Sequence, residues 1–220
     1  MQALCSFSGG KDSCLALWHA QQQGLDVRSL LVMCEENGER SRSHALPRSL
    51  LASQAQALGL ELFTRDASWS SYEAVFIDAL KDFRSRGFST AIFGDIDLQP
   101  HRDWEEKVCA AAQIEPVLPL WHRDRAELAR EVIDLGFRAV VVCVDSRYLP
   151  DEFCGRDYDA SFLADLPAGV DACGENGEFH TFVYDGPNFR ERVGFKVQGF
   201  EPYVAPKEFG GTRYVFASLK

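Results

Sequence analysis

Short apolar runs alternate along the chain with stretches in which apolar residues recur every three or four positions. The runs predict buried β-strands at residues 3–7, 27–34, 60–64, 90–93 and 139–144. The helical spacing, usually followed by a glycine, predicts helices at residues 13–23, 46–58, 72–83, 103–112 and 128–133. This alternation predicts an α/β fold in which a doubly wound parallel sheet is covered by helices on both faces.

The pattern changes after Tyr148, where proline, glycine and aspartate become frequent. Short β-like runs follow at residues 181–184, 193–197 and 213–217. We therefore predict a smaller C-terminal α+β lobe. The boundary is placed so that the first domain spans residues 1–122 and the second spans residues 123–220.

A glycine-containing loop separates the first predicted strand from the first predicted helix. Its residues are Ser8, Gly9, Gly10, Lys11, Asp12 and Ser13. Glycines let backbone N–H groups approach phosphate oxygens, and the N-terminus of the following helix attracts negative charge. The loop is neither a Walker A motif, because Cys5 stands where that motif has its first glycine, nor a G-x-G-x-x-G motif. It predicts phosphate binding, although a Gly-Gly pair before a helix also occurs as a plain turn.

A second polar segment, residues 173–187, has the composition of a loop that leads into a strand. Its candidate ligand-binding residues are Glu175, Asn176, Glu178 and His180. Together these side chains could bind a cation or a polar substrate, or transfer a proton. From composition alone a simpler interpretation is favoured, namely a hairpin turn at Asn176-Gly177 with solvated carboxylates.

Composition and charge narrow the class of protein. Hydrophobic residues make up 46% of the chain and charged residues 25%, which is typical of an ordered globular protein. The net charge of −10 disfavours nucleic acids and anionic membranes as general partners. The sequence shows neither a signal segment nor a membrane-spanning stretch, so we expect a cytoplasmic protein without a membrane partner. A homodimer is left open.

The seven cysteines contain no C-x-x-C pair. This spacing predicts neither a disulfide framework nor a zinc site. Several of the cysteines lie in apolar runs, as Cys143 does, where a free thiol behaves as a small hydrophobic group. Buried, reduced cysteines are therefore expected.

The loop at residues 8–13 resembles S-G-G-x-D-S, the pyrophosphate loop (PP-loop) of the N-type ATP pyrophosphatases, which have a Rossmann-like fold of the HUP type. The segment Gly174-Glu-Asn-Gly-Glu-Phe179, followed by a predicted strand and Tyr184-Asp-Gly-Pro187, resembles the hallmark of the diphthine–ammonia ligase family. Further matches are Gly94-Asp95-Ile96 and residues 115–121, so the resemblance covers nearly the whole chain.

The resemblance implies a ligase that splits ATP between its α and β phosphates, transfers AMP to a substrate carboxylate and then forms an amide with ammonia. It implies ATP and Mg²⁺ as cofactors. In an archaeal or eukaryotic source it implies diphthine as the acceptor, a modified histidine of elongation factor 2 with a carboxylate and a quaternary ammonium group. Residues 1–122 would form the ATP pyrophosphatase domain and residues 123–220 the substrate-binding domain.

The same resemblance assigns roles to individual residues. Lys11 and Asp12 are expected to be catalytic, and Lys11 would stabilise charge on the departing pyrophosphate. The nucleotide would be bound by residues 8–13 together with His44 and Asp95. The acceptor would be bound by the four polar residues of the second segment, with cation–π attraction from Phe179 or Tyr184. No residue is assigned to the metal.

Other functions and local roles stay open at this point. The fold also suits a nucleotide sensor without turnover, an enzyme that acts on another small carboxylate, or an RNA sulfur-transfer enzyme. Lys11 and Asp12 argue against a sensor, and the unpaired cysteines and acidic charge argue against sulfur transfer. Locally, His44 could be a solvated loop residue and Asp95 could cap a turn. Residues 101–104 could line the same crevice, although Asp103 is favoured as a helix N-cap with Trp104 in the core.

Overall fold

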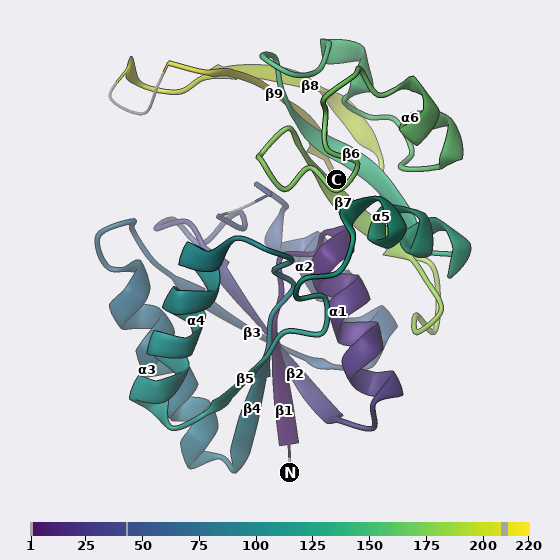
Figure 1. Cartoon of the computed structure of the whole chain (residues 1–220). Helices are drawn as coiled ribbons and strands as arrows, with labels where there is room; N and C mark the ends of the chain where they lie inside the picture. The colour runs from purple at the N-terminus through teal and green to yellow at the C-terminus, as the bar shows by residue number, and fades with distance from the viewer. Residues whose placement is uncertain (1, 43, 208–210) are drawn as a thin grey trace.

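The computed structural model describes residues 2–42, 44–207 and 211–220. Its N-terminal part is a five-stranded parallel sheet with strand order β3-β2-β1-β4-β5 (Figure 1). The strands are β1 (Gln2–Ser6), β2 (Asp26–Cys34), β3 (Glu61–Asp66), β4 (Phe88–Ile92) and β5 (Glu115–Val117). The order reverses at β1, so the predicted Rossmann-like, doubly wound α/β fold is confirmed.

Helices cover both faces of this sheet, and each face has its own apolar core. The helices are α1 (Lys11–Gln22), α2 (Arg48–Leu58), α3 (Tyr72–Ser85) and α4 (Gln99–Ala112). A further helix, α5 (Arg125–Asp134), lies beside strand β7 (Phe179–Asp185) (Figure 1). In β1, Ala3 and Cys5 point into the core shared with α1 and α2, whereas Leu4 points into the core shared with α3 and α4. Burial on both faces explains why the strands appear in the sequence as continuous apolar runs.

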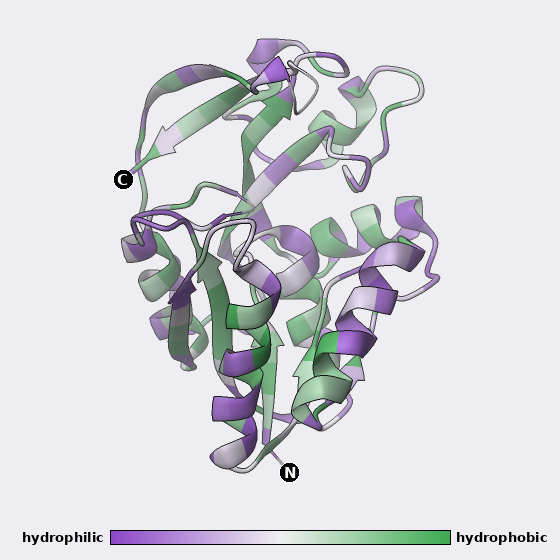
Figure 2. Cartoon of the chain, turned by 90° about the vertical axis from the view of Figure 1, so that its left-hand side faces the viewer, coloured by the Kyte–Doolittle hydropathy of each residue, from purple (hydrophilic) through white to green (hydrophobic). Residues whose placement is uncertain are grey.

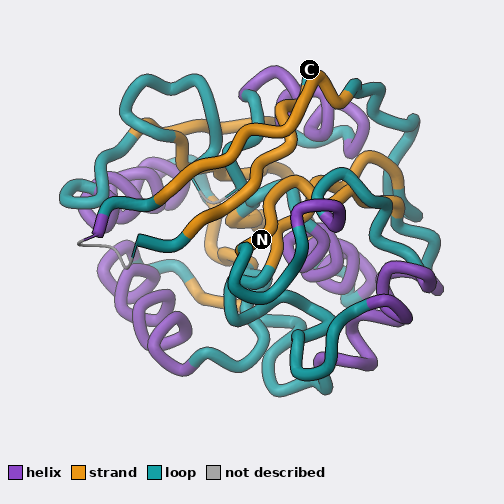
Figure 3. Tube along the Cα trace, turned by 90° about the horizontal axis from the view of Figure 1, so that it is seen from above, coloured by secondary structure: helices purple, strands orange, loops and turns teal. Residues whose placement is uncertain are grey.

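The C-terminal part is a four-stranded antiparallel sheet with order β7-β6-β9-β8. Its elements are β6 (Arg138–Asp145), the 3₁₀ turn η1 (Asp151–Phe153), α6 (Ala160–Asp165), β7 (Phe179–Asp185), β8 (Val197–Val204) and β9 (Arg213–Leu219). Apolar residues concentrate along the strands and on the inward faces of the helices (Figure 2). Seen from above, the helices lie around the strands (Figure 3).

The structure corrects three expectations. The strand predicted at residues 139–144 is β6, and it belongs to the antiparallel sheet rather than to the parallel one, because an apolar run buried on both faces does not specify the sheet that receives it. The strand predicted at residues 193–197 is wrong, because β8 begins only at Val197 and its residues are mostly exposed. Asp103 is not an N-cap, since α4 begins a turn earlier and is preceded by Leu98.

Candidate functional site

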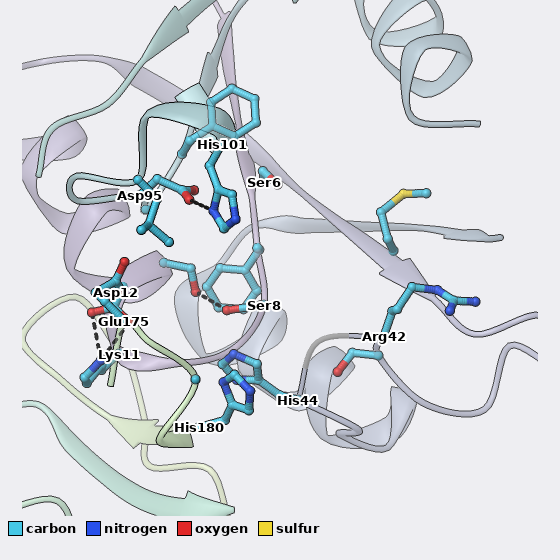
Figure 4. Close-up of a pocket in the computed structure, with 18 of the residues that line it drawn as sticks. Ser6, Ser8, Lys11, Asp12, Arg42, His44, Asp95, His101, Glu175 and His180 are labelled. Atoms are coloured by element: carbon cyan, nitrogen blue, oxygen red, sulfur yellow. Dashed lines mark hydrogen bonds and ion pairs between the residues drawn. The ribbon is translucent and has the colours of Figure 1, made fainter. Parts of the chain in front are cut away.

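A cavity of about 750 Å³ lies at the carboxyl ends of β1, β2 and β4, where the loop at residues 8–13 meets residues 173–181 (Figure 4). The loop residues that line it are Ser8, Lys11, Asp12 and Ser13. Ligands of doubly wound folds bind at this edge of the sheet. The two polar segments predicted from the sequence therefore face one cavity.

The loop is held by its own serines and by a close backbone approach. Ser13 Oγ donates to the Gly10 carbonyl at 3.0 Å and lies 3.2 Å from Ser8 Oγ. Gly9 has φ of +83°, a conformation that favours glycine. A Cβ at Gly94, at the end of β4, would lie 2.9 Å from the backbone nitrogen of Ser13. Glycine at position 94 thus lets β4 pack directly on the N-terminus of α1.

The loop is also tied to strand β7 of the C-terminal sheet. The Lys11 backbone N–H donates to Thr181 Oγ1 at 3.0 Å, and the Gly9 carbonyl accepts from the Val183 N–H at 2.9 Å. Among the described residues, no acceptor takes the N–H of Ser13, which lines the cavity. An unpaired N–H at a helix N-terminus is a binding group for an anion.

Lys11 is almost fully buried, at 3% exposure, and its ammonium group already has acceptors. Nζ donates to both oxygens of Asp12, at 2.9 and 2.8 Å, and to the carbonyl of Cys173. It also lies 5.8 Å from the centre of the Tyr158 ring and 5.6 Å from that of Phe179. Burial lowers the pKa of Lys11, but the charges of Asp12, Cys173, Tyr158 and Glu175 together outweigh burial and raise the pKa, so the charge is kept.

His44 and His180 bring the two parts of the chain together beside the loop. Their rings stack with centroids 4.7 Å apart, and His44 Nδ1 lies 2.8 Å from the Thr181 carbonyl. Because only a protonated nitrogen can donate to a carbonyl, Nδ1 carries the proton and Nε2 is left as an acceptor. Burial lowers the pKa of His44 to about 3 and that of His180 to about 4, so both rings are neutral.

Asp95 belongs to a chain of acids and bases that runs from the exposed His101 to the buried Glu105. Its carboxylate lies 2.7 Å from His101 Nδ1 and shares a hydrogen bond with Glu105. Burial opposes ionisation of Asp95, but these two hydrogen bonds lower its pKa. Burial, and then Asp95, raise the pKa of Glu105 to about 10, so Glu105 is a protonated donor at neutral pH.

Glu105 was missed in the sequence, although the signal was present. It lies three positions before Val108 and four positions before Cys109, and both of these residues pack into the apolar core beneath α4. A glutamate on the apolar face of a helix is rarely buried without a function. Two aromatic residues and a cation of the cavity were missed as well, since no motif marks them: Trp69, Tyr72 and Arg42. Trp104, which was favoured as a core residue, also lines the cavity.

Some polar residues of the second segment line the cavity, whereas others form hydrogen bonds within the segment itself. Glu175 and His180 line the cavity, and so does Phe179. Glu178 does not, because it is 1% exposed and its carboxylate accepts from the backbone N–H groups of Asp171 and Asn176 at 3.2 and 3.0 Å. The Asn176 side chain donates to the same carboxylate at 2.9 Å.

Glu178 and Asn176 therefore hold the loop in shape, and the structure does not bring them to the cavity as expected for substrate-binding residues. Tyr184 also lies outside it, with its hydroxyl 3.0 Å from Asp157. Glu175 differs, since burial first and then the charges of Asp12 and Asp95 raise its pKa to about 7. A carboxyl group with this pKa can exchange protons at neutral pH.

The cysteines and candidate metal ligands give no sign of further chemistry. All seven cysteines are buried and free. Burial raises the pKa of Cys173, the one that lines the cavity, to about 12, so its thiol stays protonated and unreactive. Across residues 2–42, 44–207 and 211–220, no three His, Cys, Asp or Glu side chains are grouped to hold a metal ion, and no helix is long and apolar enough to cross a membrane.

Known proteins resemble the chain over most of its length. It is 28% identical to a diphthine–ammonia ligase of Danio rerio, over 88% of this chain and 86% of that one. It is 26% identical to a diphthine–ammonia ligase of Mus musculus, over 88% of this chain and 82% of that one. A crystal structure described as a predicted subunit of tRNA methyltransferase from Methanocaldococcus jannaschii aligns with a TM-score of 0.47 and 16% identity, over 88% of this chain and all of that one.

Family models match both parts of the chain. Residues 1–116 match the diphthamide synthase N-terminal domain, and residues 124–205 match the diphthamide synthase C-terminal domain. The first match contains the loop at residues 8–13 and Asp95, and the second contains Glu175 and His180. The chain therefore belongs to the diphthamide synthase family.

Proposed function

We propose that this protein is an ATP-dependent ligase that adenylates the carboxylate of diphthine and amidates it with ammonia. The observation that carries the proposal is that one cavity is lined both by the glycine-containing loop at residues 8–13 and by the C-terminal segment with Glu175 and His180. The family and the names of its curated relatives support the amide-forming reaction. Residues 1–122 would then bind the nucleotide, and residues 123–220 would supply the groups that meet the acceptor.

The loop suits the pyrophosphate end of ATP. Ser8 and Ser13 offer hydroxyl groups to the cavity, and the free N–H of Ser13 lies at the N-terminus of α1, where the helix dipole favours negative charge. Leu31, Val32 and Phe93 give the cavity an apolar wall that suits a flat base. His44 Nε2 is an acceptor beside the same loop.

Magnesium is part of the proposal as the companion of ATP. The ion takes most of its ligands from phosphate oxygens and water, and it needs few protein groups. The absence of a three-residue metal group among the described residues agrees with an ion that is carried by the nucleotide. The ion would supply positive charge to the departing pyrophosphate. We assign it no protein ligand.

The predicted role of Lys11 requires its ammonium group to contact pyrophosphate, whereas the structure pairs this group with acceptors of the protein. Its three acceptor atoms are the two carboxylate oxygens of Asp12 and the carbonyl oxygen of Cys173, so its charge joins the loop to the C-terminal segment. We propose that Lys11 and Asp12 set the position of this segment against the loop, and that the helix N-terminus and magnesium stabilise pyrophosphate. Adenylation turns a carboxylate oxygen into part of a leaving group, and the amide then forms when ammonia attacks in a cavity with little water.

The product of ATP cleavage tests this function. With magnesium, ammonium and elongation factor 2 that carries diphthine, we expect AMP and pyrophosphate to form together with the amide. ADP and phosphate, or AMP formation that does not depend on the acceptor, would rule out the proposal.

A glycine variant links the reaction to the loop. A Cβ at Gly10 would lie 2.3 Å from His44 Cε1 and 3.1 Å from the Thr181 carbonyl, so Gly10→Ala should displace the loop and abolish AMP formation. Gly199→Ala is the matched control, since no atom lies within 4 Å of a Cβ there. AMP formation by Gly10→Ala at the rate of the control would contradict a role for the loop.

A further inference from the structure

A glutamine lies on the inward face of α2, where the other buried residues are hydrophobic. Gln54 comes one turn after Leu50 and one turn before Leu58, and it is 0% exposed. Glutamine is rarely buried to this extent, because its amide then needs hydrogen-bond partners in the interior. The partners of the amide therefore decide what Gln54 does.

The amide of Gln54 ties the loop at residues 8–13 to strand β7. Its Nε2 donates to the Gly9 carbonyl at 2.9 Å and to the Val183 carbonyl at 2.6 Å. These two acceptors fix the orientation of the amide, since only its N–H₂ end can donate to a carbonyl. The Val183 N–H also donates to the Gly9 carbonyl, at 2.9 Å, so this carbonyl accepts two hydrogen bonds.

The other end of the amide has no compensating contact. Gln54 Oε1 is buried and has no hydrogen-bond partner among the described residues. It faces Gly9, because a Cβ at that glycine would lie 2.7 Å from it. A buried oxygen without a donor lowers stability, and a hydrophobic side chain at this position would avoid that loss. The two donated hydrogen bonds are therefore what distinguishes glutamine from its hydrophobic neighbours on this face.

The direction of the Gly9 carbonyl fixes the direction of the next N–H group. The C=O and N–H of a trans peptide point in opposite directions, and the described residues contain no cis peptide bond. The Gly10 N–H thus points away from Gln54 and Val183. It donates to Ser8 Oγ at 3.3 Å, and Ser8 lines the cavity. Because glycine stands on both sides of this peptide, it could otherwise turn over at little steric cost.

We propose that Gln54 is a positioning residue, which holds the peptide between Gly9 and Gly10 so that the Gly10 N–H faces the two terminal phosphates of ATP. This inference rests on the proposed ligase function. Gln54 itself does not line the cavity, so it acts through the loop alone. AMP lacks the two terminal phosphates, so its binding does not depend on this peptide.

Equilibrium binding of three ligands tests this role in the whole chain. Gln54→Met removes both hydrogen bonds and keeps an unbranched side chain of similar length. With magnesium present, we expect the Kd of ATP and that of inorganic pyrophosphate to rise by about 10-fold, which corresponds to the loss of about one hydrogen bond. The Kd of AMP should stay close to that of wild type. Gln56→Met is the matched control, because Gln56 is an exposed residue of the same helix, and all three Kd values should be unchanged.

The pattern across the ligands separates positioning from a general loss of structure. Unchanged Kd values for ATP and pyrophosphate in Gln54→Met would overturn the role of Gln54, and so would an equal loss for AMP. Wild-type protein that binds neither ATP nor pyrophosphate would instead overturn the proposed function.

A measurement on the wild-type protein does not require any variant to fold. The nitrogen-15 amide resonance of Gly10 should shift when pyrophosphate binds, and it should shift much less with AMP, because the Gly10 N–H faces the terminal phosphates. A Gly10 resonance that does not respond to pyrophosphate would overturn the proposal.

Discussion

The loop at residues 8–13 and the segment at residues 173–180 are both glycine-containing and polar, yet their side chains are placed by different means. A buried strand precedes the first loop and a helix follows it, so the direction of its residues is fixed by regular structure. The second segment folds on its own hydrogen bonds, and of its two glutamates Glu178 turns inward and Glu175 faces the cavity. Motifs flanked by regular elements are therefore the better guide to side-chain direction.

The two regions are also joined mainly through backbone groups. The Cys173 carbonyl accepts from Lys11 Nζ, and the Val183 N–H donates to the Gly9 carbonyl. Backbone groups are present whatever the side chain, so this junction leaves little trace in the sequence. Side chains also take part, since Lys11 Nζ reaches the Cys173 carbonyl and Thr181 Oγ1 accepts from the Lys11 backbone N–H.

The largest expected effect comes from breaking this junction at Lys11. Lys11→Met removes the partner of the Asp12 carboxylate and of the Cys173 carbonyl. We expect the free energy of unfolding to fall by about 3 kcal/mol, the lower end of the range for a buried ion pair, because Asp12 remains 26% exposed. Unfolding in urea measures this change.

Lys81→Met is the control for the lysine substitution itself. Lys81 is 57% exposed, and its Nζ lies 4.0 Å from Asp78. We expect a change within about 0.5 kcal/mol, as for other surface substitutions. Adding Asp12→Asn to Lys11→Met should recover part of the loss, since it removes the unpaired charge. Equal stabilities of the two lysine variants would show that Lys11 does not join the regions.

The next effect distinguishes the two glutamates of the C-terminal segment. Glu178→Gln places an amide N–H₂ among three N–H donors in a site with 1% exposure, so we expect a loss of about 2 kcal/mol in unfolding free energy. Glu175→Gln removes a charge that burial disfavours, so we expect its stability to be unchanged or higher. Thermal and urea unfolding of both variants make this comparison, and a larger loss for Glu175→Gln would reverse the assignment.

The sequence predicted the fold well wherever hydrophobic periodicity specifies it. The strands that became β1, β2, β3 and β4 and the helices between them were predicted within a few residues. The sheet to which β6 belongs was not predictable, because pairing with β7 and β9 depends on residues distant in the sequence. In the site, the loop serines, Asp95 and His44 were predicted to lie together, as they do.

The acidic part of the site was only half predictable. Glu175 was recognised through a motif, but its separation from Glu178 results from turns that the sequence does not specify. The pairing of Asp95 with Glu105 requires the end of β4 to face α4, a tertiary relation that periodicity does not contain. The elevated pKa values of Glu105 and Glu175 follow from burial and neighbouring charges, so they too appear only in the folded protein.

The smallest effect concerns the histidine pair where the two regions meet. The pKa values of His44 and His180 are lowered to about 3 and about 4 in the folded protein, against an ordinary value near 6.5. The unfolded chain therefore binds more protons below pH 6.5, so stability is complete above that pH and is lost as the pH falls toward the folded pKa values. Each histidine should contribute a loss of roughly 1 kcal/mol between pH 6 and pH 5.

The variant His44→Gln isolates this contribution from the other titrating groups. Its amide can still donate to the Thr181 carbonyl, and it cannot be protonated, so the loss between pH 6 and pH 5 should be smaller than in wild type by roughly 1 kcal/mol. His101→Gln is the control, because the pKa of His101 is raised by its hydrogen bond to Asp95 and its stabilisation is lost only as the pH rises above 6.5. Urea unfolding of the three proteins at pH 6 and pH 5 gives the slope of the unfolding free energy against pH for each of them. Identical slopes for wild type and His44→Gln would mean that the stacked rings take up protons without cost. The two regions would then not meet through a neutral, half-buried pair of histidines.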